Sequence, residues 1–180
     1  MTEAVAARPQ APPARRSAIE SFDSLYRRAF PRVYAYVASL LRDRSAAEEV
    51  TAQAFERAYR KRSTFRPGRG TAEGWLFGIA RNAALDELRR MKRRATLVDD
   101  PEDVHGPAPA DHADAVVKRA TVRAALARLD GGERELVALK FHAQLSNAEI
   151  ADLLGLSPSN VGTRLHRTME KLRKACVVRT

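Results

Sequence analysis

The sequence predicts an all-α protein: two small helical domains joined by an acidic flexible linker, the carboxyl-terminal one containing a helix-turn-helix. Apolar residues recur at helical spacing in several segments, and none alternates like a strand. Residues 20–94 hold 17 basic and 9 acidic side chains and residues 115–180 hold 12 and 6, whereas residues 95–114 hold 6 acidic and no basic ones. With 44% hydrophobic content, the 180 residues suffice for two small cores.

The chain starts with a segment whose composition cannot bury enough surface to offset the entropy of ordering. Residues 1–17 are rich in Ala, Pro and Arg, which predicts a disordered leader. Residues 22–41 then carry an apolar stripe at helical spacing. Pro31 lies within this stripe and should kink or interrupt it, so the segment is either one long helix or two abutting ones.

Two further helices complete the first block. Ser45 is a suitable N-cap with Glu48 as its capping-box partner, which predicts a helix over residues 46–62. Residues 64–70 contain a proline and two glycines among cationic side chains and must form a loop. Thr71 then caps a third helix, which ends near residue 94 in a basic run.

The acidic linker, residues 95–114, lacks aromatic residues and periodicity. It contains His105 and His112 among carboxylates, but flexible spacing offers no preformed geometry for a metal ion. The single Cys176 has no partner for a disulfide or a zinc cage. No signal peptide or membrane-spanning run is present, so we expect a cytoplasmic protein without membrane insertion, metal or cofactor.

The second block reads as four helices, over residues 113–129, 131–142, 147–154 and 158–176. The third and fourth have the pattern of a helix-turn-helix. Ser146 caps the third helix with Glu149 as box partner, Gly155 permits a left-handed turn, and Ser157 with Pro158 starts the fourth helix. The polar and basic side chains left outward suit base edges and phosphates. The alternative is an ordinary helical hairpin with a solvated cationic face.

The charge balance agrees with a nucleic-acid partner. Thirty-two basic against 22 acidic residues give a net charge of +10. Such a protein is attracted to polyanions, most commonly nucleic acid and less commonly an anionic membrane surface.

Three segments, in order, resemble the extracytoplasmic-function sigma factors of the sigma-70 family. Residues 75–90 resemble that family's promoter-melting segment, W-L-x-x-I-A-R-N-x-x-x-D. Residues 46–60 are similar to its helix that docks on the polymerase clamp, with Ala54 in place of the usual acidic residue. Residues 161–167 resemble its recognition helix, with Gly162 where a basic residue is frequent.

The resemblance implies that residues 18–94 are sigma region 2 and residues 115–180 are sigma region 4. It implies three partners: core RNA polymerase through its beta-prime clamp and beta flap, promoter DNA, and an anti-sigma factor. The expected contacts with the −10 element are Phe65, Arg66, Arg69, Arg81, Asn82, Arg89, Arg90 and Arg93. The expected contacts with the −35 element are Ser159, Asn160, Thr163, Arg164, His166 and Arg167. The expected polymerase contacts are Glu48, Glu49, Gln53, Phe55, Glu56 and Arg57.

Several of these assignments have simpler alternatives. Trp75 could stack on DNA, but its place on the apolar stripe favours the core. Phe55 could equally be a core residue, and the basic run after Leu88 a solvated helix end. A stand-alone helix-turn-helix regulator is the rival function. A nuclease is disfavoured because no carboxylate cluster on a rigid element, metal spacing or phosphate loop is present, and we expect no enzymatic activity.

Overall fold

The computed structural model describes residues 13–97 and 113–177, which are almost wholly helical and contain no strand. The all-α prediction is therefore confirmed. The elements are α1 (Pro13–Leu41), α2 (Arg44–Lys61), η1 (Arg62–Thr64), η2 (Pro67–Arg69), α3 (Ala72–Leu97), α4 (Ala113–Ala127), α5 (Gly131–Val137), η3 (Ala138–His142), α6 (Asn147–Leu154) and α7 (Pro158–Val177). None of the helices in these ranges combines the length and apolarity needed to cross a membrane.

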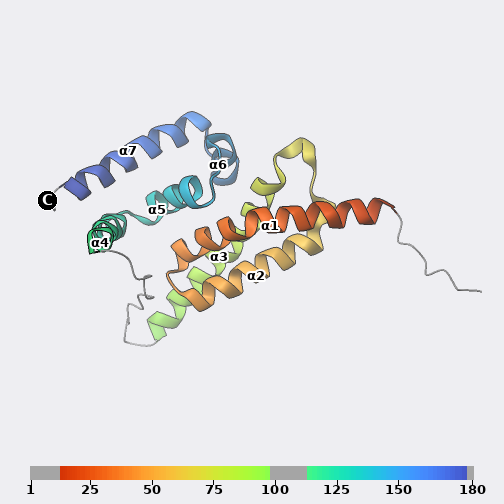
Figure 1. The fold of residues 1–180 in the computed structure, drawn as a ribbon, viewed down its shortest axis with the longest axis horizontal. Helices are drawn as coiled ribbons and strands as arrows, with labels where there is room; N and C mark the ends of the chain where they lie inside the picture. Colours follow the sequence, from red (N-terminus) through yellow and green to blue (C-terminus); the bar gives the residue numbers. More distant parts are fainter. Residues whose placement is uncertain (1–12, 98–112, 178–180) are drawn as a thin grey trace, which may run out of the picture.

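Helices α1, α2 and α3 lie side by side and form the first module (Figure 1). The sequence left open one long helix or two abutting ones, and the structure has the first: α1 is one continuous helix through Pro31. Pro31 and Arg27, one turn earlier, are both exposed, so water can bind the carbonyl that loses its helical partner. Helix α1 begins at Pro13, so residues 13–17 belong to it and not to a leader. Residues 1–12 lie outside the described ranges.

The start of α2 differs from the prediction. Asp43, not Ser45, is the N-cap: its Oδ1 accepts the Ala46 N–H at 2.8 Å. The preceding Arg42 has a left-handed backbone, with φ of 57°, and the chain therefore turns earlier than the sequence suggests. Glu48 does not complete a capping box and instead pairs with Arg44 at 3.0 Å.

The second module contains α4 to α7, and its helix-turn-helix is confirmed. Ser146 and Glu149 form the capping box of α6, and Gly155 ends that helix with φ of 66°. The helix expected over residues 131–142 is divided into α5 and the π-helical turn η3, where the Ala143 N–H donates to the Ala138 carbonyl at 2.9 Å.

The two modules pack against each other, which the sequence did not predict. One continuous hydrophobic core includes residues of both, among them the fully buried Tyr36, Phe77, Leu139 and Ile150. Helix α1 contacts η3, and α3 contacts α6 (Figure 1). Of the predicted linker, residues 95–97 and 113–114 are helical, and residues 98–112 lie outside the described ranges.

Candidate nucleic-acid interface

One face of helix α7 packs against the rest of its module, and the opposite face is exposed to solvent. The Asn160 N–H donates to Ser157 Oγ at 3.2 Å, and Pro158 occupies the first helical position, as predicted. Val161, Leu165 and Thr168 are buried against the rest of the module. The helix therefore presents its opposite face to solvent in a fixed orientation.

All six residues expected to contact the −35 element are exposed. They are Ser159, Asn160, Thr163, Arg164, His166 and Arg167. Two of them, Arg164 and Arg167, line a hollow of about 390 Å³, together with three leucines and the acidic residues Asp130, Glu133 and Glu135. The cationic face of α7 thus ends where the acidic start of α5 begins.

Helix α3 carries a second exposed polar stripe. Asn82, Arg89 and Arg93 are separated by seven and four residues, which places them on one face of a helix, and all three are exposed. Asp86 lies between them and pairs with Arg89 at 2.9 Å, while Arg90 pairs with Glu87 at 3.5 Å. The Arg89–Asp86 pair is exposed on both sides and therefore contributes little free energy, so Arg89 can exchange its carboxylate for a phosphate.

The loop before α3 places further predicted residues at the amino end of the helix. The Phe65 ring lies 5.6 Å from the Trp75 ring, and Arg66 and Arg69 are exposed. Thr71 caps α3 as predicted, accepting the Gly74 N–H at 2.9 Å. Trp75 is half-buried and packs against the hydrophobic core, in agreement with the core interpretation.

Arg81 lies apart from the exposed stripe of α3. Its Nε and Nη2 donate to the two carboxylate oxygens of Glu135 in α5, at 2.7 and 3.3 Å. Only 23% and 14% of the two side chains are exposed. Tyr36 donates to the same carboxylate at 3.3 Å, and burial, followed by the charge of Glu135, raises the pKa of this phenol. In this arrangement Arg81 binds the other module.

Helix α2 presents charged residues at its surface. Glu48, Glu49, Glu56 and Arg57 are exposed and Gln53 is half-buried. The expected apolar anchor of this surface, however, is a core residue. Phe55 is only 5% exposed, in keeping with the simpler alternative.

The exposed apolar groups nearby are aromatic residues that the sequence analysis assigned to the core or overlooked. Tyr26, Phe30 and Tyr59 are 40%, 38% and 41% exposed. The rings of Tyr26 and Phe30 lie 4.8 and 5.7 Å from that of Phe55, and Tyr59 packs on Phe22 at 5.2 Å. We call these five residues the aromatic cluster. The sequence did contain a sign of this cluster. Phe22, Tyr26 and Phe30 are spaced by four residues, and because a helix has 3.6 residues per turn, side chains at this spacing move progressively around the helix and away from its core face.

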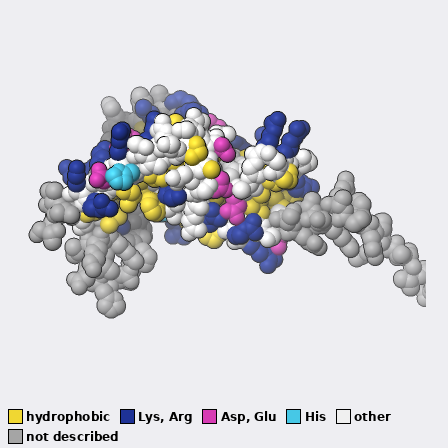
Figure 2. Space-filling view, turned by 90° about the horizontal axis from the view of Figure 1, so that it is seen from above, with side chains coloured by type: hydrophobic (Ala, Val, Ile, Leu, Met, Phe, Trp, Pro, Cys, Tyr) yellow, Lys and Arg dark blue, Asp and Glu magenta, His cyan; other side chains and the backbone are white. Residues whose placement is uncertain are grey.

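Figure 2 shows Lys and Arg side chains over both ends of the molecule, with several acidic side chains near the middle of that face. Residues 13–97 and 113–177 contain no group of three His, Cys, Asp or Glu that could hold a metal ion. His105 and His112 lie outside these ranges. Cys176 is a free, half-buried thiol.

Comparison with known families matches both modules. Residues 25–94 match the family described as Sigma-70 region 2, and residues 119–172 match Sigma-70, region 4. The chain is 35% identical over 162 residues to RNA polymerase sigma factor CarQ of Myxococcus xanthus, covering 89% of this chain and 91% of that protein. It is 29% identical over 159 residues to ECF RNA polymerase sigma factor SigK of Mycolicibacterium vanbaalenii, covering 86% and 81%.

Solved structures share the fold. Sigma factor RpoE, in complex with the anti-sigma factor NepR from Bartonella quintana, superposes with a TM-score of 0.72 at 22% identity, covering 88% of this chain and 98% of that one. CnrH, in complex with the cytosolic domain of CnrY, gives a TM-score of 0.67 at 24% identity, covering 93% and 96%.

Proposed function

Because this chain belongs to the extracytoplasmic-function sigma factors of the sigma-70 family, which direct core RNA polymerase to particular promoters, we propose a division of labour between its two exposed helices. Helix α7 reads the −35 element as duplex. Helix α3 and the loop before it capture the −10 element as separated strands. The same assignment gives the protein a cytoplasmic location and a role in recognition, with no bond-making chemistry of its own.

The −35 assignment rests on the shape and chemistry of α7. An α-helix fits the major groove, where its amino-terminal side chains reach base edges. Here the first turns expose Ser159, Asn160 and Thr163, which can exchange hydrogen bonds with bases. Arg164 and Arg167 follow one turn on and can bind guanine bidentately or hold phosphate.

The −10 assignment rests on the loop and the stripe of α3. Capture of an extruded base needs hydrogen bonds to its edge and an apolar surface on which it stacks. Asn82 offers an exposed amide, and the half-buried Phe65 ring, which packs on the core residue Trp75 about two helical turns from Asn82, offers apolar surface. The exposed arginines of the loop and stripe are suited to the phosphates of the opened strand.

The polymerase contact is proposed for α2 together with the aromatic cluster. A protein interface commonly has apolar anchors within a charged rim, and aromatic residues are enriched among the anchors. Tyr26, Phe30 and Tyr59 supply exposed aromatic area, and Glu48, Glu49, Glu56 and Arg57 supply the rim. We assign this surface to the beta-prime clamp and the second module to the beta flap. RpoE and CnrH were solved with an anti-sigma factor and with CnrY, and an anti-sigma factor is a proposed partner here too.

One observation carries the proposal: a single chain exposes two separate DNA-suited faces, on α3 and on α7. In vitro transcription with purified core polymerase on a library of genomic fragments tests it. We expect new start sites that require both core polymerase and this protein. Tight duplex binding by the protein alone, without new start sites, would instead indicate a stand-alone regulator.

A further inference from the structure

The loop before α3, residues 62–71, is attached at its amino end to the last turn of α2. The Lys61 carbonyl accepts the Thr64 hydroxyl at 2.7 Å, and the Arg62 carbonyl accepts the Phe65 N–H at 3.4 Å. The last carbonyls of a helix have no partner within it, and groups of the loop supply partners here. The position of Phe65, whose ring is proposed above to support an extruded base, therefore depends on how α2 ends.

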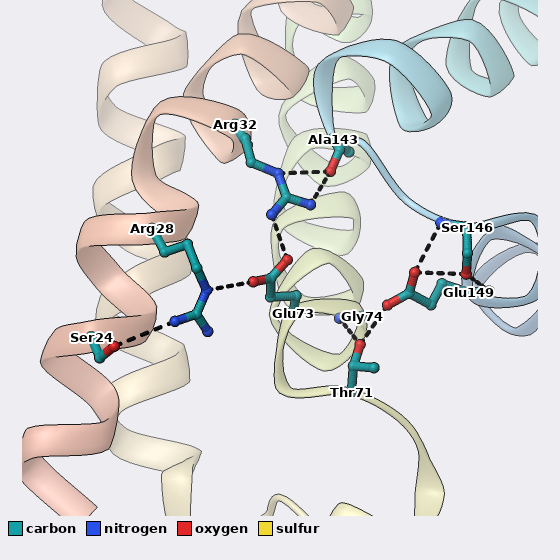
Figure 3. Close-up of polar contacts among 9 residues, drawn as sticks. All are labelled: Ser24, Arg28, Arg32, Thr71, Glu73, Gly74, Ala143, Ser146 and Glu149. Atoms are coloured by element: carbon teal, nitrogen blue, oxygen red, sulfur yellow. Dashed lines mark hydrogen bonds and ion pairs between the residues drawn. The ribbon is translucent and has the colours of Figure 1, made fainter.

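The carboxyl end of the loop is attached to α3 and α6. Thr71 is the N-cap of α3, and its hydroxyl donates to Glu149 Oε1 of α6 at 2.6 Å (Figure 3). Glu149 Oε2 accepts the N–H and the hydroxyl of Ser146, at 2.8 and 2.7 Å. This end of the loop is thus held by hydrogen bonds that do not involve α2, and contacts at α2 decide how the other end lies.

The side chain of Arg62 folds back onto α2. Its Nη1 donates to the Tyr59 carbonyl at 2.6 Å, and its guanidinium carbon lies over the Tyr59 ring, 4.0 Å from the ring centre. An aromatic ring attracts a cation over its face, and the attraction is larger when water is excluded. Phe22 of α1 packs on the same ring at 5.2 Å. Tyr59 therefore belongs both to the aromatic cluster and to the support of the loop.

A second arginine of the same turn has a different environment. Arg60 binds Glu56 at 2.6 Å, which is an ordinary exposed pair. Within residues 13–97 and 113–177, no carboxylate pairs with Arg62, although it is exposed like Arg60. A guanidinium is weakly hydrated and stacks on aromatic faces, so Arg62 can stay on the ring when another protein covers it.

We propose that Arg62 is a positioning residue for capture of the −10 element: it ties the loop before α3 to the aromatic cluster, and docking of core polymerase on that cluster strengthens the tie. The inference rests on the proposed function, which places polymerase on Tyr59 and the opened strand near Phe65. In the free chain the Tyr59 ring is 41% exposed, so water weakens the cation–π contact. A polymerase surface over the ring removes this water.

The loop is then held in place more completely on the polymerase than in the free chain. Only chains whose loop is in place can capture an extruded base, so a contact that raises their fraction raises the apparent affinity for the opened strand by the same factor. Arg62 acts here through Tyr59 and has no need to touch DNA. In this it differs from Arg66 and Arg69, which are proposed to bind phosphate.

Trp75 reports the position of the loop. It is the only tryptophan of the chain, and the Phe65 ring packs on it at 5.6 Å. With 5-hydroxytryptophan at this position, its emission can be excited apart from that of polymerase tryptophans, and acrylamide quenching measures how well it is covered. In the holoenzyme, Arg62→Gln and Tyr59→Leu should each raise quenching about twofold, and the double variant should match the single ones.

Two controls define this result. Arg60→Gln removes a neighbouring arginine that lies on no ring, and it should quench as wild type does. In the free chain, Arg62→Gln should change quenching less than in the holoenzyme, because the contact is weaker in water. Leucine favours the helix, so Tyr59→Leu removes the ring without weakening α2. Unchanged quenching in both single variants of the holoenzyme would overturn the proposal.

The rate of strand opening at saturating core polymerase is the second readout. Arg62→Gln should lower it about tenfold in wild type and in Tyr59→Phe, which keeps the ring, but less than about twofold in Tyr59→Leu. An equal loss in the Tyr59→Leu background would mean that Arg62 contacts DNA directly, and would overturn the inference while leaving the proposed function intact. Failure of the wild type to open any promoter would refute the proposed function, and the inference with it.

Discussion

Helices α7 and α3 each carry a proposed DNA contact, but their surroundings differ. Helix α7 has one buried and one open face, and all six predicted contact residues are on the open one. Helix α3 has its core face, its exposed stripe and a third face along Gly74, Gly78 and Arg81, which contacts the other module. The difference teaches that a recognition helix can be assigned from local pattern, whereas the role of a residue on α3 depends on what packs against it.

The largest effect is expected on α7. Arg164→Ala should lower the affinity of the holoenzyme for its promoter about tenfold or more, because a bidentate contact with a base contributes about 1–3 kcal/mol. Promoter binding by the reconstituted holoenzyme measures this. Arg173→Ala, an exposed arginine about two and a half turns further along the helix, is the control and should cost much less affinity. Equal losses would mean that α7 contributes charge alone.

The exposed stripe of α3 should act at a later step. Asn82→Ala should lower the rate of strand opening about tenfold, as expected for loss of one base contact, while initial duplex binding changes little. Permanganate reactivity of unpaired thymines measures opening. Asp86→Ala, one turn away on the same stripe, is the control. If Asn82→Ala weakened duplex binding and opening equally, capture of a single base would be the wrong role for it.

Two glycines distinguish a position that is determined by local backbone conformation from one that is determined by packing against another helix. Gly155→Ala should destabilise the fold by about 1–2 kcal/mol, because its φ of 66° is costly for alanine although no atom obstructs the methyl group. Gly78→Ala should be neutral or stabilise by up to about 1 kcal/mol, because alanine favours the helix and the methyl group fits against Leu153. Urea unfolding compares them: Gly155→Ala should lower the free energy of unfolding, and Gly78→Ala should leave it unchanged or raise it.

The smallest expected effect is on how the stability of the fold changes with pH. Burial alone would raise the pKa of Glu149, but hydrogen bonds from Thr71 and Ser146 outweigh it and leave that pKa lowered. A carboxyl group with a lowered pKa in the folded state stabilises the fold in full above its unfolded pKa of about 4.3, and this contribution is lost as pH falls below it. Urea midpoints should therefore fall less steeply below about pH 4.3 for Glu149→Gln, whose amide keeps the capping geometry, than for wild type. Parallel curves would contradict this.

Much of the second module could be predicted because its signals are local. The caps at Ser146 and Ser157 and the left-handed Gly155 are set by residues within one helical turn, and the structure has all three. The Thr71 cap of α3 was found for the same reason. Once the helix boundaries are right, the outward face of α7 follows from helical periodicity.

The predictions from sequence were wrong where the position of a residue depends on contacts with distant parts of the chain or on the backbone of a neighbouring turn. Phe55 is buried because Tyr26 and Phe30 of another helix cover it, and Arg81 turns to Glu135, 54 positions along the chain. Asp43 caps α2 because Arg42 adopts a left-handed backbone. No local pattern in the sequence showed that the face of α3 along Gly74 and Gly78 would pack against α6.

Footprinting of the holoenzyme on one identified promoter tests the central claim most directly. With wild type we expect two protected segments about 25 base pairs apart and reactive thymines in the downstream one. Arg164→Ala should remove protection of the upstream segment, and Asn82→Ala should remove the reactive thymines while upstream protection remains. Loss of the same segment in both variants, or a single continuous contact at one element, would contradict two separate readers on one chain.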